Sequence, residues 1–161
     1  MVTVEIRTTR FDHPDAMKLN DLVQQEYVLR YGDGDLTTMD AAHFAPPQGL
    51  YLLVYDTDGT PVASGGWRAQ DASPEGFTDG DAEVKRMFVV PEARGRGLAR
   101  RLLAELESTA AAAGRQRMVL ETGLKQPEAI RLYESSGYAP VDKFGYYRDH
   151  ELSVCMGKPL S

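Results

Sequence analysis

The order of apolar and polar positions in the first fifty residues predicts one strand followed by two helices. Apolar residues alternate with polar ones at the start of the chain, as in a half-buried strand: Val2, Val4 and Ile6. Asp12 is expected to cap a helix that ends near Gly32, because the residues between them carry an apolar face. A second, short helix is expected after Thr37, and the prolines at 46–47 end it.

Three strands and a long helix are expected in the middle of the chain. Apolar runs predict strands at 50–55, 61–68 and 82–90, and a polar loop at 70–81 separates the last two. The turn at 56–59 ends in Asp-Gly, which is typical of a hairpin between two strands. Gly114 is expected to end a helix whose buried face carries leucines spaced four residues apart: Leu98, Leu102 and Leu106.

The last third of the chain completes an α+β pattern. A short strand at 118–120, a helix from Pro127 to Gly137 and strands around 138–141 and 152–156 are expected. The strand–helix–strand passage from 82 to 120 implies a parallel pair within a mixed sheet. The length of 161 residues predicts a single domain at 1–161.

Composition and charge exclude several classes of protein. Eighteen Lys and Arg residues against 24 Asp and Glu residues give a net charge of −6, which disfavours nucleic acid and anionic membranes as partners. No apolar run approaches the roughly 20 residues that span a bilayer, and the N-terminus lacks a signal-peptide pattern. Cys155 is the only cysteine, and the three histidines have no metal-ligand spacing. We therefore expect a cytoplasmic protein without a metal site.

A glycine-rich turn between a strand and the long helix predicts a phosphate site. Gly95 and Gly97 let an anion approach the backbone, where the first N–H groups of a helix have no internal partners. Arginines add positive charge around this turn: Arg94, Arg96, Arg100 and Arg101. The spacing excludes a Walker loop, which needs Lys-Ser or Lys-Thr after its last glycine, and a dinucleotide fingerprint, which needs a third glycine or alanine.

The same turn resembles a known family signature. Arg94-x-x-Gly97-x-Ala99 is similar to the Q/R-x-x-G-x-G/A motif of the GNAT superfamily of acyl-CoA-dependent N-acetyltransferases. The segment at 85–91 resembles that family's fourth strand and its proline stop, and 129–138 resembles its A-x-x-L-Y-E-x-x-G-F/Y segment. The resemblance implies a mixed, mostly antiparallel sheet, helices on both faces and a splayed parallel strand pair.

The resemblance also implies acetyl-CoA as co-substrate, with its pantetheine arm in the gap between the splayed strands and its pyrophosphate on the glycine-rich turn. The residues that it implies for cofactor binding are Met87, Phe88, Val89, Arg94, Gly95, Arg96, Gly97, Leu98, Ala99, Arg100 and Gln126. Gln126 departs from the family pattern, which often has Asn at this position.

Acetyl transfer needs an amine that has lost its proton, and a partner for the departing thiolate. The resemblance gives the second role to Tyr133, whose alternative role is that of a core aromatic. Either Glu121 or Glu83 is a candidate for the base, with Glu121 ranked first. The alternatives are that Glu83 is a solvated strand residue and that Glu121 pairs with an arginine such as Arg86.

Acceptor residues are expected from the first helices and the C-terminal strand pair, namely Tyr27, Tyr31 and Tyr146. Aromatic walls near Asp33 and Asp35 would suit a cationic amine. The sequence thus predicts acetylation of a primary amine, most simply on a small molecule, by direct attack in a ternary complex. A CoA-binding protein without turnover, an enzyme acting on peptide or protein amines, and a homodimer all remain open.

Overall fold

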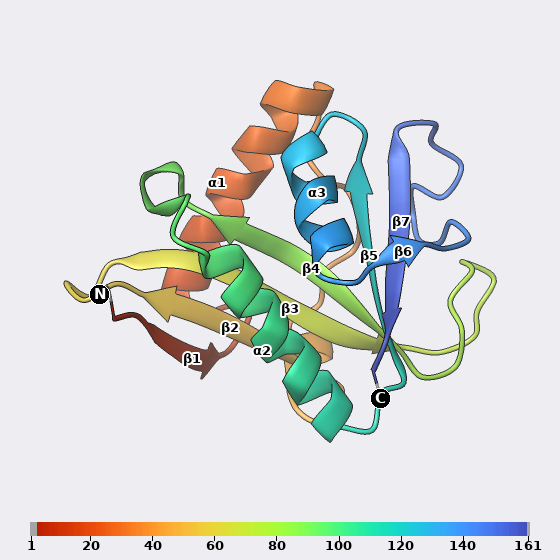
Figure 1. The fold of residues 1–161 in the computed structure, drawn as a ribbon, viewed down its shortest axis with the longest axis horizontal. Coiled ribbons are helices and arrows are strands. Elements are labelled where there is room, and N and C mark those ends of the chain that lie inside the picture. Colours follow the sequence, from red (N-terminus) through yellow and green to blue (C-terminus); the bar gives the residue numbers. More distant parts are fainter. Residues whose placement is uncertain (1–2, 161) are drawn as a thin grey trace.

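The computed structural model describes residues 3–160, which form an α+β fold (Figure 1). The elements in chain order are β1 (Glu5–Thr9), α1 (Pro14–Tyr31), the 3-10 helix η1 (Ala41–Phe44), β2 (Gly49–Tyr55), β3 (Pro61–Gln70), β4 (Asp81–Val89), the 3-10 helix η2 (Pro91–Ala93), α2 (Leu98–Ala112), β5 (Arg117–Gly123), α3 (Pro127–Ser135), β6 (Ala139–Pro140) and β7 (Ser153–Pro159). Within the described residues, the strands form one sheet in the order β1-β2-β3-β4-β5-β7-β6. Only the β4–β5 neighbours are parallel, which confirms the mixed, mostly antiparallel sheet.

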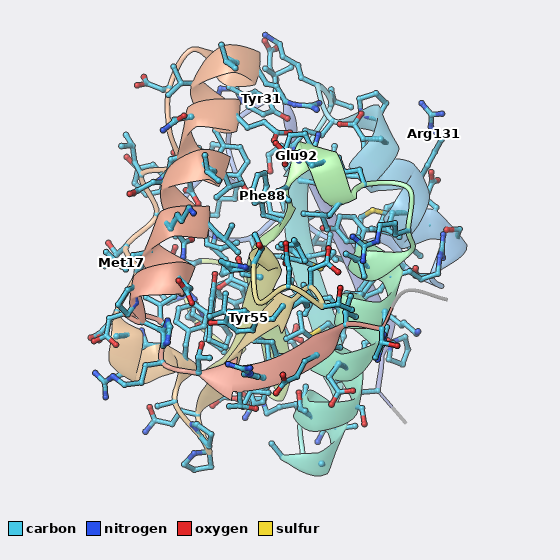
Figure 2. All side chains as sticks on the ribbon, turned by 90° about the vertical axis from the view of Figure 1, so that its left-hand side faces the viewer. Met17, Tyr31, Tyr55, Phe88, Glu92 and Arg131 are labelled. Carbon is cyan, nitrogen blue, oxygen red and sulfur yellow. The ribbon has the colours of Figure 1, made fainter. Side chains whose placement is uncertain are left out.

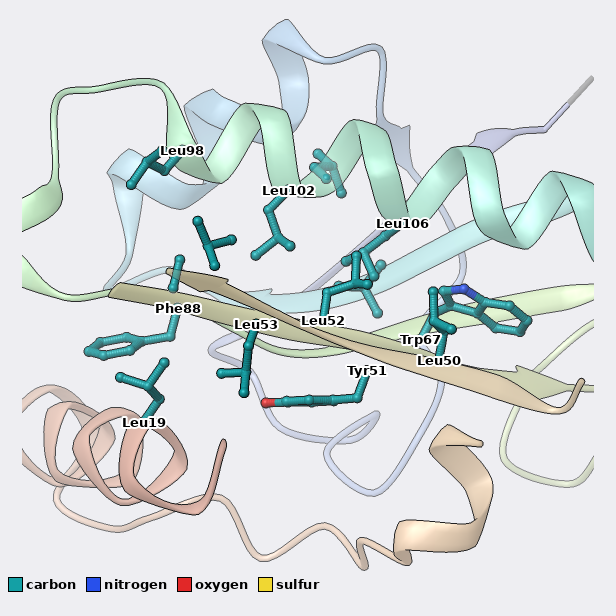
Figure 3. Close-up of a cluster of buried hydrophobic side chains, with 14 of the residues drawn as sticks. Leu19, Leu50, Tyr51, Leu52, Leu53, Trp67, Phe88, Leu98, Leu102 and Leu106 are labelled. Atoms are coloured by element: carbon teal, nitrogen blue, oxygen red, sulfur yellow. The ribbon is translucent and has the colours of Figure 1, made fainter. Parts of the chain in front are cut away.

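Helices cover both faces of the sheet, as predicted. Figure 3 shows α2 on one face, with its regularly spaced leucines directed at the strands: Leu98, Leu102 and Leu106. On the opposite face, Leu19 of α1 points toward the sheet and belongs to the same buried cluster as Tyr51 and Phe88. Trp67 is 2% exposed, and its indole N–H donates to Thr109 of α2 at 3.0 Å, so it belongs to the core. Burial of these large side chains stabilises the packing of both helices on the sheet.

The start of α1 and the short helix after it differ from expectation. Asp12 is not the N-cap of α1, because its carboxylate pairs with Arg10 at 2.7 Å and the His13 side chain accepts the Asp15 N–H instead. The short helix η1 starts at Ala41, where Asp40 caps it. Val2, expected in the first strand, lies outside the described residues. No helix within residues 3–160 has the length and apolarity needed to cross a membrane.

The parallel pair opens part of the way along its length. β4 and β5 pair only over Asp81–Glu83 and Arg117–Val119, and beyond these residues the two strands diverge (Figure 1). The register between β3 and β4 shifts between Ser64 and Gly66, so Arg86 and the residue after it share one position opposite Gly65. This is a β-bulge, and Arg86 takes a positive φ of 59°. The splayed pair predicted from the resemblance is therefore present.

Candidate active site

A cavity of about 370 Å³ lies where β4 and β5 separate, and we call it the splay cavity. Its wall comes from the end of α1 and the loop after it, from β4 and β5, and from the segment before β7: Tyr27, Tyr31, Asp33, Gly34, Asp35, Leu36, Val84, Lys85, Arg86, Glu121, Thr122, Gly123, Gln126, Tyr147, His150, Leu152 and Ser153. Three charged side chains of this wall come from neighbouring strands, and the sequence motifs alone do not place them together: Lys85, Arg86 and Glu121.

A second cavity of about 510 Å³, the loop cavity, lies beside it. Residues from the loop before η1, from β3 and β4 and from the loops at 71–80 and 141–152 surround it, among them Arg68, Gln70, Glu83 and Tyr146. Lys85 and Glu121 line both cavities. Volumes of this order match the roughly 300–1,000 Å³ of small-molecule sites.

Glu121 lies in β5, opposite Cys155 of β7, and its carboxylate reaches the boundary between the two cavities. The Ser153 hydroxyl donates a hydrogen bond to Glu121 Oε2 at 2.5 Å. Burial is the main cause that raises the pKa of Glu121 above its ordinary 4.5, against the opposing effects of Ser153 and Lys85. A carboxylate with a raised pKa is a stronger proton acceptor, as a general base requires. The described residues give Glu121 no ion pair with Arg86, whose carboxylate partner is Asp35.

Glu83 lies in the paired part of β4 and is only 3% exposed, so it is not a solvated strand residue. It faces its cross-strand partner Arg68, whose Nε donates to Glu83 Oε1 at 2.9 Å. The Gln70 amide donates to the same oxygen at 3.0 Å. These bonds commit Glu83 to a buried ion pair beside the loop cavity.

Tyr133 is 8% exposed in α3, and its ring packs edge-on against Tyr138 at a centroid distance of 5.9 Å. Burial raises its pKa to about 12. Within residues 3–160 its hydroxyl has no hydrogen-bond partner, and Tyr133 lines neither of the two cavities. Among the described residues, the Tyr133 hydroxyl therefore has no competing hydrogen bond, but it does not lie in the cavity wall with Glu121.

The glycine-rich turn leads into α2 with the geometry that an anion needs. Gly97 is the N-cap of α2 at φ 76°, and no side chain caps this end of the helix. Gly95 has a φ of 81°, and a Cβ at either glycine would meet no atom within 4 Å. The first-turn N–H groups that follow, from Leu98 to Arg100, have no intrahelical acceptor. Open space in front of uncapped amides fits a pyrophosphate group.

The arginines near this turn differ in how far their charge is already balanced. Arg94 pairs with Glu26 of α1 at 2.9 Å, and Arg96 forms two bonds with Asp56 at 2.9 and 3.1 Å. Among the described residues, Arg100 donates only to the hydroxyls of Ser135 and Ser136, at 2.9 and 3.2 Å. Its partners at the end of α3 are neutral, so Arg100 keeps a full charge for an anionic ligand.

The diverging part of β4 carries the strand residues expected to hold the cofactor arm. Phe88 is 7% exposed and packs toward α1, where Figure 2 also labels Tyr31 near the helix end. The Tyr31 hydroxyl donates to Gln126 Oε1 at 3.1 Å across the end of β5. Beyond Glu83, β4 forms no pairs with β5, so Met87 and Val89 lie on an edge without a neighbouring strand, where the Val89 carbonyl accepts a bond from Arg94 Nε at 3.0 Å.

The expected acceptor tyrosines fall in two places. Tyr27 and Tyr31 line the splay cavity, whereas Tyr146 lines the loop cavity and is 58% exposed. Tyr147 is a third tyrosine of the splay cavity, and its hydroxyl accepts the Leu36 N–H at 2.8 Å, which joins two loops at the cavity wall. From the sequence, Lys85 has no expected role and Arg86 is expected only as a partner for Glu121, although charges in a buried apolar strand are a signal for function.

A mixed sheet that splays at its parallel pair, next to a glycine-rich turn and an uncapped helix, defines the architecture of the acyl-CoA N-acyltransferases. The chain belongs to the acetyltransferase (GNAT) family, whose model matches residues 16–138, and it is an N-acetyltransferase. A protein of Azospirillum brasilense named "IAA acetyltransferase" is 42% identical over 132 residues, which cover 79% of this chain and 82% of the relative.

Two solved structures share the fold over nearly the whole chain. A Klebsiella pneumoniae protein assigned to the acyl-CoA N-acyltransferases is 30% identical, with a TM-score of 0.76 and coverage of 100% of this chain and 99% of the other. An acetyltransferase-family structure from Salmonella typhimurium, described with its cofactor acetyl-CoA, is 20% identical with a TM-score of 0.71. It covers 98% of this chain and 94% of its own, and shows likeness of fold alone.

Proposed function

We propose that this enzyme transfers the acetyl group of acetyl-CoA to a primary amine of a small molecule, by direct attack in a ternary complex. The observation that carries the proposal is the position of Glu121, a half-buried carboxylate in the wall of a cavity at the point where β4 and β5 diverge. Holding an amine and a thioester together in that gap supplies proximity, which can contribute several kcal/mol to catalysis.

The residues that would hold acetyl-CoA follow the gap and the glycine-rich turn. Backbone groups on the unpaired edge of β4 would bind the extended arm: Met87, Phe88 and Val89. The pyrophosphate would bind the amides at 95–100, assisted by the uncommitted charge of Arg100. Gln126, the N-cap of α3, lines the splay cavity, and its amide would lie beside the arm. When bound, acetyl-CoA supplies an acetyl group activated as a thioester, and its fold relative from Salmonella typhimurium supports this cofactor.

Glu121 is the first candidate for the base, acting directly or through a water molecule. Its raised pKa favours proton uptake, while Ser153 orients the carboxylate. Glu83 remains the second candidate, although its ion pair with Arg68 lowers its availability. A backbone N–H of the bulged part of β4 is suited to stabilise the carbonyl oxygen as negative charge develops.

Tyr133 is suited to stabilise the departing sulfur by a hydrogen bond rather than by complete proton transfer. Its pKa of about 12 lies well above that of an ordinary thiol near 8.5, so full transfer would be uphill by roughly 5 kcal/mol. A hydroxyl without a competing partner among the described residues is free to donate such a bond. Because Tyr133 lies outside both cavities, this role requires the thiol to pass alongside α3.

The proposal extends to the protein as a whole. We propose one acetyltransferase domain at residues 1–161, because strands on both sides of the matched region join the same sheet. The single cysteine and the net charge of −6 support a cytoplasmic location and argue against nucleic acid as a partner. Cavities of small-molecule size support a small acceptor over a peptide or protein amine.

Release of free CoA from acetyl-CoA in the presence of a panel of primary amines tests this function. We expect release that depends on the amine and that Glu121→Gln reduces. A thermal shift with acetyl-CoA but no release with any amine would instead favour a CoA-binding protein without turnover.

A further inference from the structure

Two buried cations in the splay cavity share one carboxylate oxygen. The Lys85 ammonium lies 3.5 Å and the Arg86 Nε 3.4 Å from the same atom, Asp35 Oδ2. Ion-paired hydrogen bonds of this kind are normally about 2.7–2.9 Å long, so neither cation is well satisfied. The side chains of Lys85 and Arg86 are 9% and 6% exposed, which excludes full hydration as the alternative.

Arg86 carries the clearest sign of a missing partner. Its Nε is buried and forms no hydrogen bond with any described residue. Its Nη1 reaches Asn20 Oδ1 only at 3.4 Å. The residue is also held at a positive φ by the bulge in β4, so the backbone fixes this side chain at the cavity wall. Buried polar groups in folded proteins almost always have partners, and an orphaned guanidinium nitrogen beside a cavity points to an acceptor supplied by a ligand.

The remaining charges give the cavity two ends of opposite sign. Lys85 and Arg86 stand on β4 with Asp35 between them, whereas Glu121 stands on β5 with the Ser153 hydroxyl bonded to it. Asp33, the third carboxylate of the wall, is exposed to solvent, and Glu83 is paired with Arg68 outside this cavity. A ligand that fills the cavity and carries only positive charges would place one of them beside Lys85 and Arg86, which repel it. A zwitterion would place its ammonium group near Glu121 and its carboxylate near the β4 cations.

We propose that the acceptor amine also carries a carboxylate, as an α-amino acid does, and that Arg86 and Lys85 bind that carboxylate in the splay cavity. This inference rests on the proposed acetyl transfer and names its substrate class. It differs from the cationic amine expected from the sequence. That expectation relied on Asp33 and Asp35, and the Asp35 carboxylate already pairs with Lys85 and Arg86. The guanidinium of Arg86 provides the planar donor that suits a carboxylate.

The test compares amino acids with the amines that remain after removal of the carboxylate. The pairs are L-phenylalanine with phenethylamine, L-leucine with isopentylamine and L-tryptophan with tryptamine. We expect kcat/KM for CoA release to be about 10- to 100-fold higher for the amino acid of at least one pair, as for loss of a charge-assisted bond. Equal rates, or faster reaction of the decarboxylated amines, would overturn the carboxylate site while leaving acetyl transfer intact.

Two substitutions with opposite expected signs separate a binding role from a structural one. Arg86→Gln removes the guanidinium, and should raise the KM for the amino acid about 10-fold or more while the KM for the decarboxylated amine stays within about twofold. Asp35→Asn removes the competing carboxylate, and should lower the KM for the amino acid. Loss of both activities in parallel in Asp35→Asn would show a merely structural cluster and overturn the proposal.

Two further measurements keep the inference distinct from the proposed function. The acetyl-CoA thermal shift reports whether each variant is folded, and Lys85→Gln replaces Arg86→Gln should the latter not fold. A thermal shift with the amino acids alone, lost in the Arg86 or Lys85 variant, supports the carboxylate site even without CoA release. That result would overturn acetyl transfer to these amines and retain the site.

Discussion

The hydroxyl of Tyr31 occupies the space that a side chain at Gly123 would need. A Cβ at Gly123 would overlap the Tyr31 hydroxyl, which lies at the end of α1 and bonds to Gln126 at the start of α3. Because Gly123 has no side chain, Tyr31 at the end of α1 can reach across β5. This contact closes one side of the splay cavity and joins an expected acceptor residue to an expected cofactor residue.

Gly123→Ala is expected to push the Tyr31 ring aside and to break its hydrogen bond with Gln126. We expect a loss of about 1 kcal/mol in the free energy of unfolding, the usual value of one such bond, together with a higher KM for the acceptor. In a Tyr31→Ala background the same change should cost almost nothing. Urea unfolding of the four proteins of this double-mutant cycle measures the coupling. Equal costs in both backgrounds would contradict the proposed contact.

Gly97→Glu is expected to abolish the rise in melting temperature that acetyl-CoA causes. The substitution places a negative charge in the open space before the uncapped amides of α2, where the pyrophosphate is proposed to bind. It also strains a backbone at φ 76°, at a cost of about 1 kcal/mol or more.

Gly114→Glu is the matched control for that strain. Gly114 has a φ of 85° and equally open surroundings, but it follows the other end of α2. This variant should lose similar stability and keep the acetyl-CoA shift. If folded Gly97→Glu kept the full rise in melting temperature with acetyl-CoA, the phosphate site could not lie at this turn.

Helix ends marked by glycine are predictable from the sequence because glycine readily adopts positive φ. Gly32 ends α1 at φ 84° and Gly97 precedes α2 at φ 76°, both close to their predicted places. The N-cap of α1 was less predictable. Asp12 and His13 can both accept a backbone N–H, and the choice depends on Arg10, which holds the Asp12 carboxylate.

The site is less predictable, because its key contacts join residues far apart in the chain. Arg68 faces Glu83 only in the register that β3 and β4 adopt beside the bulge, and that register cannot be read from either strand alone. The same bulge turns Arg86 toward Asp35 rather than Glu121. The family signature could place the glycine-rich turn, since its geometry is local. The signature could not show which carboxylates already form ion pairs with the protein's own lysines and arginines.

Tyr133→Phe is expected to lower turnover about 10- to 10⁴-fold with little change in acetyl-CoA affinity. The Tyr133 hydroxyl has no partner within residues 3–160, so its removal should leave the free energy of unfolding nearly unchanged. Tyr138→Phe is the contrasting variant. Its hydroxyl donates to Glu107 at 2.8 Å, and its loss should reduce stability rather than turnover. Wild-type turnover in Tyr133→Phe would rule out a role for that hydroxyl.

The stability of the protein is expected to depend on pH through Glu121. Burial raises its pKa in the folded state above the ordinary 4.5, so the folded chain holds a proton that the unfolded chain has already lost. The contribution of Glu121 is fully present below pH 4.5 and is lost as pH rises through the folded pKa. Glu121→Gln removes this dependence and should gain stability relative to the wild type across that window. A gain that instead grows toward lower pH would contradict the raised pKa.

The choice of base is tested by replacing each glutamate with its amide. Glu121→Gln should lower turnover about 10²- to 10⁴-fold at neutral pH, the range expected for a general base. The loss should shrink at high pH, where more of the free amine is already neutral. Glu83→Gln should have the smaller effect on turnover and the larger effect on stability, about 3 kcal/mol, because it leaves buried Arg68 without its charged partner. Turnover is compared at a temperature where both variants are folded. The reverse ranking would move the base to Glu83, and unchanged turnover in both would mean that the amine arrives neutral and is only positioned.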